Sequence, residues 1–357
     1  MKNPSGASKP SFFSWLIRLF CKLKPPAPVH IVPPDNTLEP ARIVTTRVLL
    51  VVFDPVMDLA SGIKLSQLMH WQSPNDLANG CIQDILEVSG GLARYQIVQR
   101  MELNEFPVKS DGYCYDPQTY LDVWKGIKPA HMPEGADYQS ILIKLNVLPH
   151  IAMRDIDEVW LFAFPHAGFY ESSMGGADAF WCNSQPLTWS SGCTRRFIIM
   201  GFSYERGIGE MLESFGHRSE ALIGKVFDCQ EFVDWAYRKI RVPALVGPTL
   251  NSFQEFICFD QIAPGKSGVG TIHFAPNSDR DYDWNNPRTV PSTCYDWYNF
   301  PKFQNDVRQL NSDEWGNGDI RIHHKWWLKH LPKVPGRTNG VANNWWQYIM
   351  DPNLINI

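Results

Sequence analysis

The sequence predicts an α/β (or α+β) domain built on a mixed sheet with parallel strands, with helices packed against it. Residues 47–54 (RVLLVVFD) and 156–164 (IDEVWLFAF) are the apolar runs expected of strands buried on both faces. Between the first run and a strand over 93–98 lies a helical segment that begins at Pro74 and stops at Gly90 and Gly91. A strand–helix–strand unit favours parallel pairing.

The following elements complete this core. A helical stretch is expected over 137–153, an edge strand in the loop after 164, a strand over 197–202 and a helix over 208–223. A further helix over 227–240 has Asp228 as its N-cap, and residues 111–135 read as irregular. Beyond 241 the chain is Trp-, Asn- and Pro-rich, apart from a periodic stretch at 252–262 and a helical one at 323–331.

These segments predict one large domain over 42–357, with its core over about 42–240 and a long irregular region over about 241–357 that wraps it. Residues 1–41 form an N-terminal appendage and Pro-rich linker. The apolar run at 12–21 is interrupted by Arg18 and is shorter than the ~20 residues that span a bilayer. We expect it to contact a membrane surface or a partner, which favours a secreted or membrane-surface location over a cytoplasmic one.

Composition narrows the class of protein. The 357 residues are 44% hydrophobic and 20% charged, as in globular domains. A net charge of -4 without a basic block argues against nucleic-acid binding. No C-x-x-C pair marks a zinc knuckle, and Cys182 with Cys193 is the best candidate disulfide, although free thiols fit equally well.

The helix over 208–223 carries the main candidate metal site. Glu210, Glu213, His217 and Glu220 form one polar stripe on it. Glu213 and His217 have the i, i+4 spacing of two zinc ligands, and the pair His217 and Glu220 at i, i+3 is an alternative. An ordinary solvated helix face would show the same pattern.

The third ligand must come from later in the chain. His273, in an apolar stretch before a polar loop, is the first candidate, with His323 and His324 in reserve. Glu220 or Glu171 would act as proton acceptor. Glu171 and His166 follow a strand's carboxyl end, where α/β proteins gather functional groups, although a plain turn without a function is the favoured alternative for this segment.

Two other segments suggest ligands. Asp279, Asp281 and Asp283 alternate as calcium ligands do, but Trp284 and Val290 depart from the EF-hand pattern. An Asx-rich turn that caps its own backbone is the alternative, as is support of His273 by Asp281 or Asp283. Two adjacent pairs of tryptophans near the C-terminal end suggest glycan stacking: Trp326 with Trp327, and Trp345 with Trp346. Because adjacent side chains point in different directions, at least one of each pair is expected in the core.

Two resemblances add to this interpretation. The phrases DEVWLFAFPHAGFYES, GEMLESFGHRSE and HFAPNSDRDYDW resemble a family of uncharacterised bacterial proteins, which implies no catalytic residues. The order strand–helix–strand–strand–edge strand–strand–helix resembles zincin-type metallopeptidases, in which the edge strand holds an extended peptide and the helix supplies metal ligands. The H-E-x-x-H signature itself is absent.

The zincin resemblance implies a zinc-dependent, peptidase-like hydrolase with a variant metal site made by Glu213, His217 and His273. Its substrate would be a peptide or protein. The alternative is a non-catalytic surface protein that binds a glycan or a protein on a degenerate zincin-like scaffold. A shared metal position for His217 and His273, about 2 Å from each nitrogen, distinguishes the two.

Overall fold

A computed structural model describes residues 35, 39–239 and 250–356. The apolar run at 12–21 and most of the Pro-rich linker lie outside these residues. At the start of the described chain, Glu39 forms an ion pair with Arg337 (2.6 Å), and the first strand begins at Val44. None of the described helices is long and apolar enough to cross a membrane.

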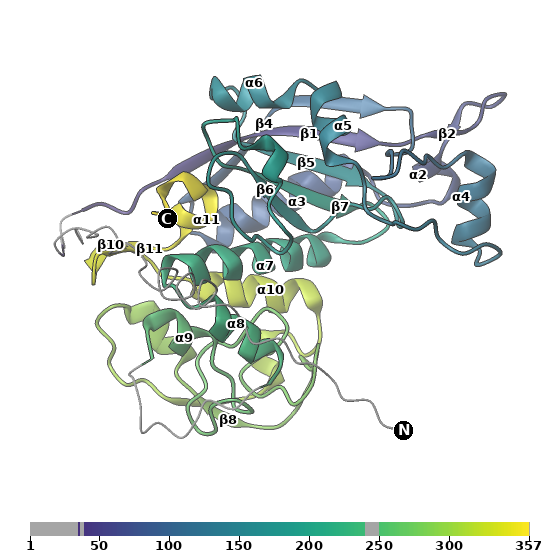
Figure 1. Ribbon diagram of the computed structural model, residues 1–357. Coiled ribbons are helices and arrows are strands. Elements are labelled where there is room, and N and C mark those ends of the chain that lie inside the picture. The colour runs from purple at the N-terminus through teal and green to yellow at the C-terminus, as the bar shows by residue number, and fades with distance from the viewer. Residues whose placement is uncertain (1–34, 36–38, 240–249, 357) are drawn as a thin grey trace, which may run out of the picture.

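A five-stranded mixed sheet forms the centre of the fold, with strand order β4-β1-β5-β7-β6 (Figure 1). Its first four strands run parallel, and the edge strand β6 runs antiparallel to β7. The bounds are β1 Val44–Phe53, β4 Ala93–Leu103, β5 Glu158–Ala163, β6 Ser172–Gly175 and β7 Phe197–Ser203. The predicted α/β class and mixed sheet are confirmed.

Within the described residues, three two-stranded antiparallel ladders accompany this sheet. They pair β2 Val56–Asp58 with β3 Ile63–Lys64, β8 Val290–Ser292 with β9 Arg308–Leu310, and β10 Lys333–Thr338 with β11 Val341–Asn344. In the chain, the first ladder lies between β1 and α3 (Pro74–Val88), and the other two lie in the C-terminal region.

Helices α3, α7 and α10 contact one another, and α7 and α10 run side by side between the sheet and the C-terminal region (Figure 1). Each has an apolar side that is buried in the common core. The helices are α2 Leu65–Leu68, α3 Pro74–Val88, α4 Pro117–Trp124, α5 Tyr138–Lys144, α6 Val147–Ala152, α7 Ile208–Val226, α8 Gln230–Tyr237, α9 Ser252–Ile257, α10 Ile320–His330 and α11 Trp346–Met350.

Three local predictions were wrong. The helical stretch over 137–153 is two helices, because Asn146 adopts a left-handed backbone conformation between α5 and α6. The segment predicted to be irregular contains α4, whose N-cap Asp116 accepts hydrogen bonds from Gln118 N and Thr119 N. Asp228 has a positive φ of 48° and precedes the N-cap of α8, which is Cys229.

The candidate disulfide is also absent. All seven cysteines of the described chain are free. Cys182 Sγ lies 3.6 Å from the Ser172 hydroxyl, whereas Cys193 Sγ faces the Leu148 carbonyl. The two thiols therefore have different neighbours, and both belong to the buried core.

The C-terminal tryptophans are core residues. Trp327, Trp345 and Trp346 are fully buried, and Trp326 is 8% exposed, so none presents a ring face on which a sugar can stack. Trp345 packs against Phe227 of the core and Phe253 of α9 with ring centroids 5.1 and 5.9 Å apart. The interpretation of these four side chains as glycan platforms is wrong, because they join the C-terminal region to the rest of the fold.

Candidate metal centre

A buried ion pair orients α7. Arg218 is fully buried, and its Nη1 donates to Glu158 Oε1 of β5 at 2.6 Å. Burial lowers the pKa of Arg218, but Glu158 outweighs it, and the net shift is upward. Since consecutive helical residues point about 100° apart, anchoring Arg218 against the sheet directs His217 away from it, toward the C-terminal region.

Gly216 lets the C-terminal region approach this helix closely. A Cβ at position 216 would clash with the side chain of Ile272. The backbone of the approaching segment is also held, because Ile272 N donates to Glu220 Oε1 at 2.9 Å. These two contacts bring His273, the next residue, to α7.

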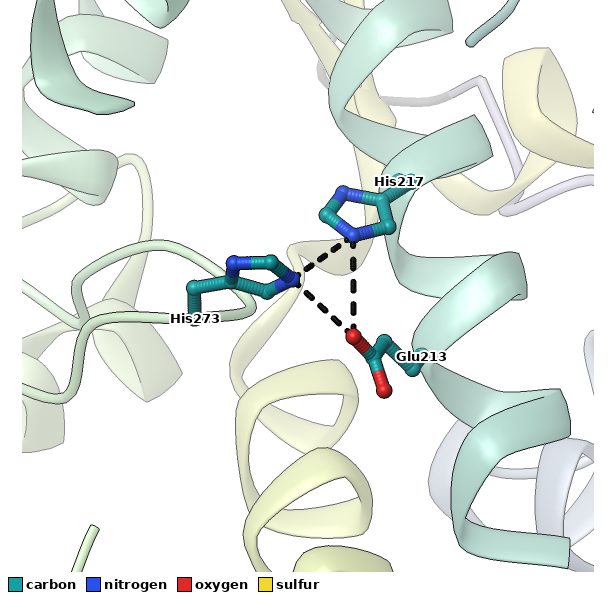
Figure 2. A group of neighbouring side chains, drawn as sticks. All are labelled: Glu213, His217 and His273. Atoms are coloured by element: carbon teal, nitrogen blue, oxygen red, sulfur yellow. Dashed lines mark hydrogen bonds and ion pairs between the residues drawn. The ribbon is translucent and has the colours of Figure 1, made fainter. Parts of the chain in front are cut away.

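Three side chains converge at this junction (Figure 2). His273 Nε2 lies 2.9 Å from His217 Nε2 and 3.0 Å from Glu213 Oε1, and the last two atoms are 4.0 Å apart. The sides of that triangle, 2.9 to 4.0 Å, bracket the separation of about 3.3 Å between ligand atoms that lie about 2.0 Å from a tetrahedral zinc ion. Within the described ranges, this is the group of three His, Cys, Asp or Glu side chains whose ligand atoms lie within 4.8 Å of one another.

Each histidine has an acidic partner behind it. His217 Nδ1 lies 3.3 Å from Glu220 Oε2, and His273 Nδ1 lies 3.1 Å from Asp281 Oδ1. Without a metal, His273 Nε2–H can donate to Glu213 Oε1 at 3.0 Å. A carboxylate only accepts, so the proton facing each acidic partner belongs on Nδ1, and a bound metal would take the lone pair of each Nε2. Two nitrogen lone pairs and the Glu213 carboxylate then face one point, an arrangement that a cation stabilises.

Glu220 supports His217 and does not reach the cleft. The side chain is 2% exposed, and Tyr237 donates its hydroxyl to Glu220 Oε2 at 2.6 Å. Both carboxylate oxygens are therefore engaged inside the protein, since the other accepts from Ile272 N. This geometry gives Glu220 a positioning role in place of the proton-acceptor role expected from the sequence.

The polar stripe on α7 is not a solvated surface. Glu213 and Glu220 are buried, and the side chains of His217 and His273 are 14% and 13% exposed. Glu210 caps the helix by accepting from Gly207 N. The ordinary surface-helix interpretation is thus wrong, and the partial exposure leaves the three-residue group accessible.

Burial and neighbouring groups shift two of the pKa values. Burial raises the pKa of Glu213, but the hydrogen bond with His273 and the surrounding histidines outweigh it and lower that pKa to about 2. Burial lowers the pKa of His217, but Glu220 outweighs it and leaves the pKa above its ordinary value. The carboxylate is therefore ionised throughout the physiological range.

The reserve histidines do not join this group. His324 Nδ1 lies 3.0 Å from the Gly209 carbonyl, and burial lowers the pKa of His324 to about 4. His323 is fully buried and stacks on Trp284 with ring centroids 4.7 Å apart. Both histidines pack behind the site, between α10 and the segment that follows His273.

The three aspartates of the calcium hypothesis have separate partners. Asp281 contacts His273, Asp279 forms an ion pair with Arg288 at 3.1 Å, and Asp283 accepts from Asp279 N at 3.0 Å. The described part of the chain does not bring their oxygens into one ligand group. Asp283 thus caps its own loop, as the Asx-turn alternative predicts, and Asp281 supports His273.

A cleft of about 680 Å³ adjoins the metal group. Its lining includes Glu213 from α7, and His166 and Glu171 from the segment between β5 and β6. Glu171 Oε2 accepts from Asn183 Nδ2 at 2.6 Å, and His166 Nδ1 lies 3.2 Å from Glu134 Oε1. The lining of the cleft thus includes the carboxylate of Glu171 as well as that of Glu213.

Lys109 fixes the outer wall of this cleft. The side chain is fully buried, and its ammonium group donates to the carbonyls of Glu134 and His166. Burial lowers the pKa of Lys109. A buried cation held by two carbonyls of the cleft lining ties two separate loops together, and nothing in the sequence around Lys109 signals this role.

The edge strand β6 is covered. Leu187 N donates to Met174 O at 2.9 Å, and a bridge pairs Gly175 with Leu187. Every residue of β6 is buried. An extended peptide therefore cannot pair with β6 as the zincin resemblance implies, because the loop after β6 folds back over the strand.

Sequence reasoning missed two tyrosines of the site. Tyr237 donates to Glu220, and Tyr282 donates to Glu213 Oε1 at 3.0 Å. Tyr237 lies on a predicted helix, but its direction depends on how α8 packs. The alternating aspartates around Tyr282 indicated a calcium loop, and that pattern assigns no role to the tyrosine between them.

No known family, curated protein or solved structure matches this chain. The function therefore has to be argued from the geometry of the site.

Proposed function

We propose that this protein is a zinc-dependent, peptidase-like hydrolase whose zinc ligands are Glu213, His217 and His273. One observation carries the proposal: three possible ligand atoms lie 2.9 to 4.0 Å from one another, around the separation of about 3.3 Å expected for ligands of tetrahedral zinc. The acidic partners of both histidines support it, because such partners fix the tautomer that leaves Nε2 free for a metal.

The donor set suits catalysis. Catalytic zinc sites use three protein ligands and keep a position open, and two histidines with one glutamate are a common set. Bound zinc would polarise a carbonyl and make water a stronger nucleophile. Two histidines and a carboxylate also bind iron(II) in oxygenases, so the identity of the bound metal is part of the test.

Glu171 is the proposed proton acceptor. It lines the same cleft as Glu213, and it accepts a hydrogen bond from the neutral amide of Asn183, which does not compensate its charge. A carboxylate in this position can take a proton from water and return it to the leaving nitrogen.

The chain order β1–α3–β4–β5–β6–β7–α7 supports the peptidase-like class, because the candidate ligand helix follows the sheet as in the zincin resemblance. Because β6 is covered, the substrate is expected to lie along the cleft instead. The cleft is lined by residues 163–171 and by the segment after β7.

The experiment compares zinc-loaded wild-type protein with Glu171→Gln on a mixed peptide library read by mass spectrometry. We expect wild-type cleavage, and a loss of about 10²- to 10⁴-fold in the variant with zinc content unchanged. Zinc-loaded wild-type protein that cleaves no peptide would refute the peptidase assignment. An undiminished rate in Glu171→Gln would refute the role of that residue.

A further inference from the structure

One short segment is built around His273. In the stretch from Asp281 to Trp284, Asp281 binds His273 Nδ1, and Trp284 Nε1 donates to the His273 carbonyl at 2.9 Å. The ring of Tyr282 packs on the imidazole with centroids 4.3 Å apart. Three residues of this segment therefore hold the histidine, and Tyr282 is the one that also contacts Glu213.

The hydroxyl of Tyr282 is hydrogen-bonded to a proposed ligand atom. It donates to Glu213 Oε1 at 3.0 Å, and that oxygen is a corner of the ligand triangle. Since a metal would lie about 2.0 Å from Oε1, the hydroxyl lies within about 5 Å of it. Half of the tyrosine is exposed, so the phenol faces solvent at the site.

The backbone holds Tyr282 in this direction. The residue has a φ of 56°, in the left-handed region that a bulky side chain seldom adopts. Asp281 and Asp283, on either side of it, are tied to His273 and to Asp279 N. An exposed aromatic ring held in an unfavourable conformation points to a role for its hydroxyl.

We propose that Tyr282 is a catalytic residue that donates a hydrogen bond to the carbonyl oxygen of the scissile bond. This inference rests on the proposed hydrolase function. The oxygen of water bonds to the carbonyl carbon, Glu171 takes the proton of that water, and the carbonyl oxygen gains negative charge. The C–N bond then breaks, and the leaving nitrogen receives the proton from Glu171.

Tyr282 keeps its own proton throughout this sequence. Its contribution is a hydrogen bond that strengthens as charge develops on the carbonyl oxygen, which stabilises the transition state more than the bound substrate. The hydroxyl needs only to shift from Glu213 Oε1 to a neighbouring oxygen. A ring already packed on His273 makes that shift short.

The test is Tyr282→Phe, which keeps the ring and removes the hydroxyl. In zinc-saturated protein we expect kcat to fall about 10²- to 10³-fold, with KM within about threefold. Tyr298→Phe, another exposed tyrosine of the C-terminal region, is the matched control and should keep wild-type kcat. If the hydroxyl only held Glu213 in place, Tyr282→Phe would have wild-type kcat once zinc is saturating; that result overturns the proposal.

A second measurement does not depend on turnover. A peptide phosphonate carries the charged oxygens of the transition state, and its affinity for zinc-loaded protein can be measured by calorimetry. Tyr282→Phe should bind it about 10- to 100-fold more weakly, since a hydrogen bond to a charged group is lost. Equal affinity contradicts the role of Tyr282 even if peptides are cleaved. A wild-type protein that neither cleaves peptides nor binds the phosphonate overturns the proposed function together with this inference.

Discussion

The substitution Glu220→Gln tests how the site is organised. Glu220 Oε1 accepts from Ile272 N at 2.9 Å, while Oε2 accepts from Tyr237 and faces His217 Nδ1. A glutamine has one oxygen, and if that oxygen stays on Ile272 N, its NH₂ group faces Nδ1. Two donors cannot share that contact, so the imidazole changes tautomer and Nε2 acquires the proton. The lone pair on which metal binding depends is then lost.

The expected loss of zinc affinity in Glu220→Gln follows from the position of Glu220. Loss of a partner behind a ligating histidine weakens metal binding about 10- to 100-fold, or about 1.4 to 2.7 kcal/mol. Glu220 is nearly inaccessible to solvent, so we expect the upper half of that range. Competition with a coloured zinc chelator measures it. Glu210→Gln is the matched control on the same helix, because an amide oxygen still accepts from Gly207 N.

The result that refutes this reasoning is a Glu220→Gln protein with wild-type zinc affinity. In that case the carboxylate behind His217 would not determine the tautomer of the ring, and Glu220 would contribute only to the fold.

Three further predictions follow from the surroundings of the site. Gly216→Ala should displace the segment that carries His273 and weaken zinc binding at least tenfold, measured by the same competition, whereas Gly192→Ala, where an added Cβ meets no atom within 4 Å, should not. The pKa of Glu213 is lowered to about 2, so its ionised form stabilises the metal-free fold above about pH 4.5. The loss of unfolding free energy in Glu213→Gln should accordingly shrink as the pH falls from 4.5 toward 2 in urea titrations, and a pH-independent loss would contradict the shift. Glu158→Gln should cost about 3 to 5 kcal/mol of unfolding free energy, because it leaves the Arg218 charge buried without its partner; a cost under about 1 kcal/mol would show that the pair is not essential.

Much of the sheet and its helices could be predicted from the sequence, because buried strands and amphipathic helices have strong periodic signals. The i, i+4 spacing of Glu213 and His217 needs only a helix to bring them together. His273 is 56 positions further along, and only its apolar context before a polar loop singled it out. The structure brings the three together because Gly216 allows close contact there.

The parts that could not be predicted depend on packing between distant segments. Whether Glu220 faces the cleft or His217 is decided by Tyr237 and Ile272, which lie on other elements. The cover over β6 depends on the path of its following loop, for which no periodic signal exists. Adjacent tryptophans such as Trp345 and Trp346 are both buried because two surfaces close over them.

Elemental analysis of the purified protein tests the central claim most directly. The account predicts one zinc per chain in the wild type, and its loss from both His217→Ala and His273→Ala, with circular dichroism showing a retained fold. Asp281→Asn should retain the metal with weaker affinity, because the Asp281 side chain is 58% exposed and only supports His273. Stoichiometric zinc that persists in both histidine variants, or a zinc-reconstituted wild type that holds no metal, would contradict the account. Iron in place of zinc would keep the ligand set and contradict the assignment of zinc.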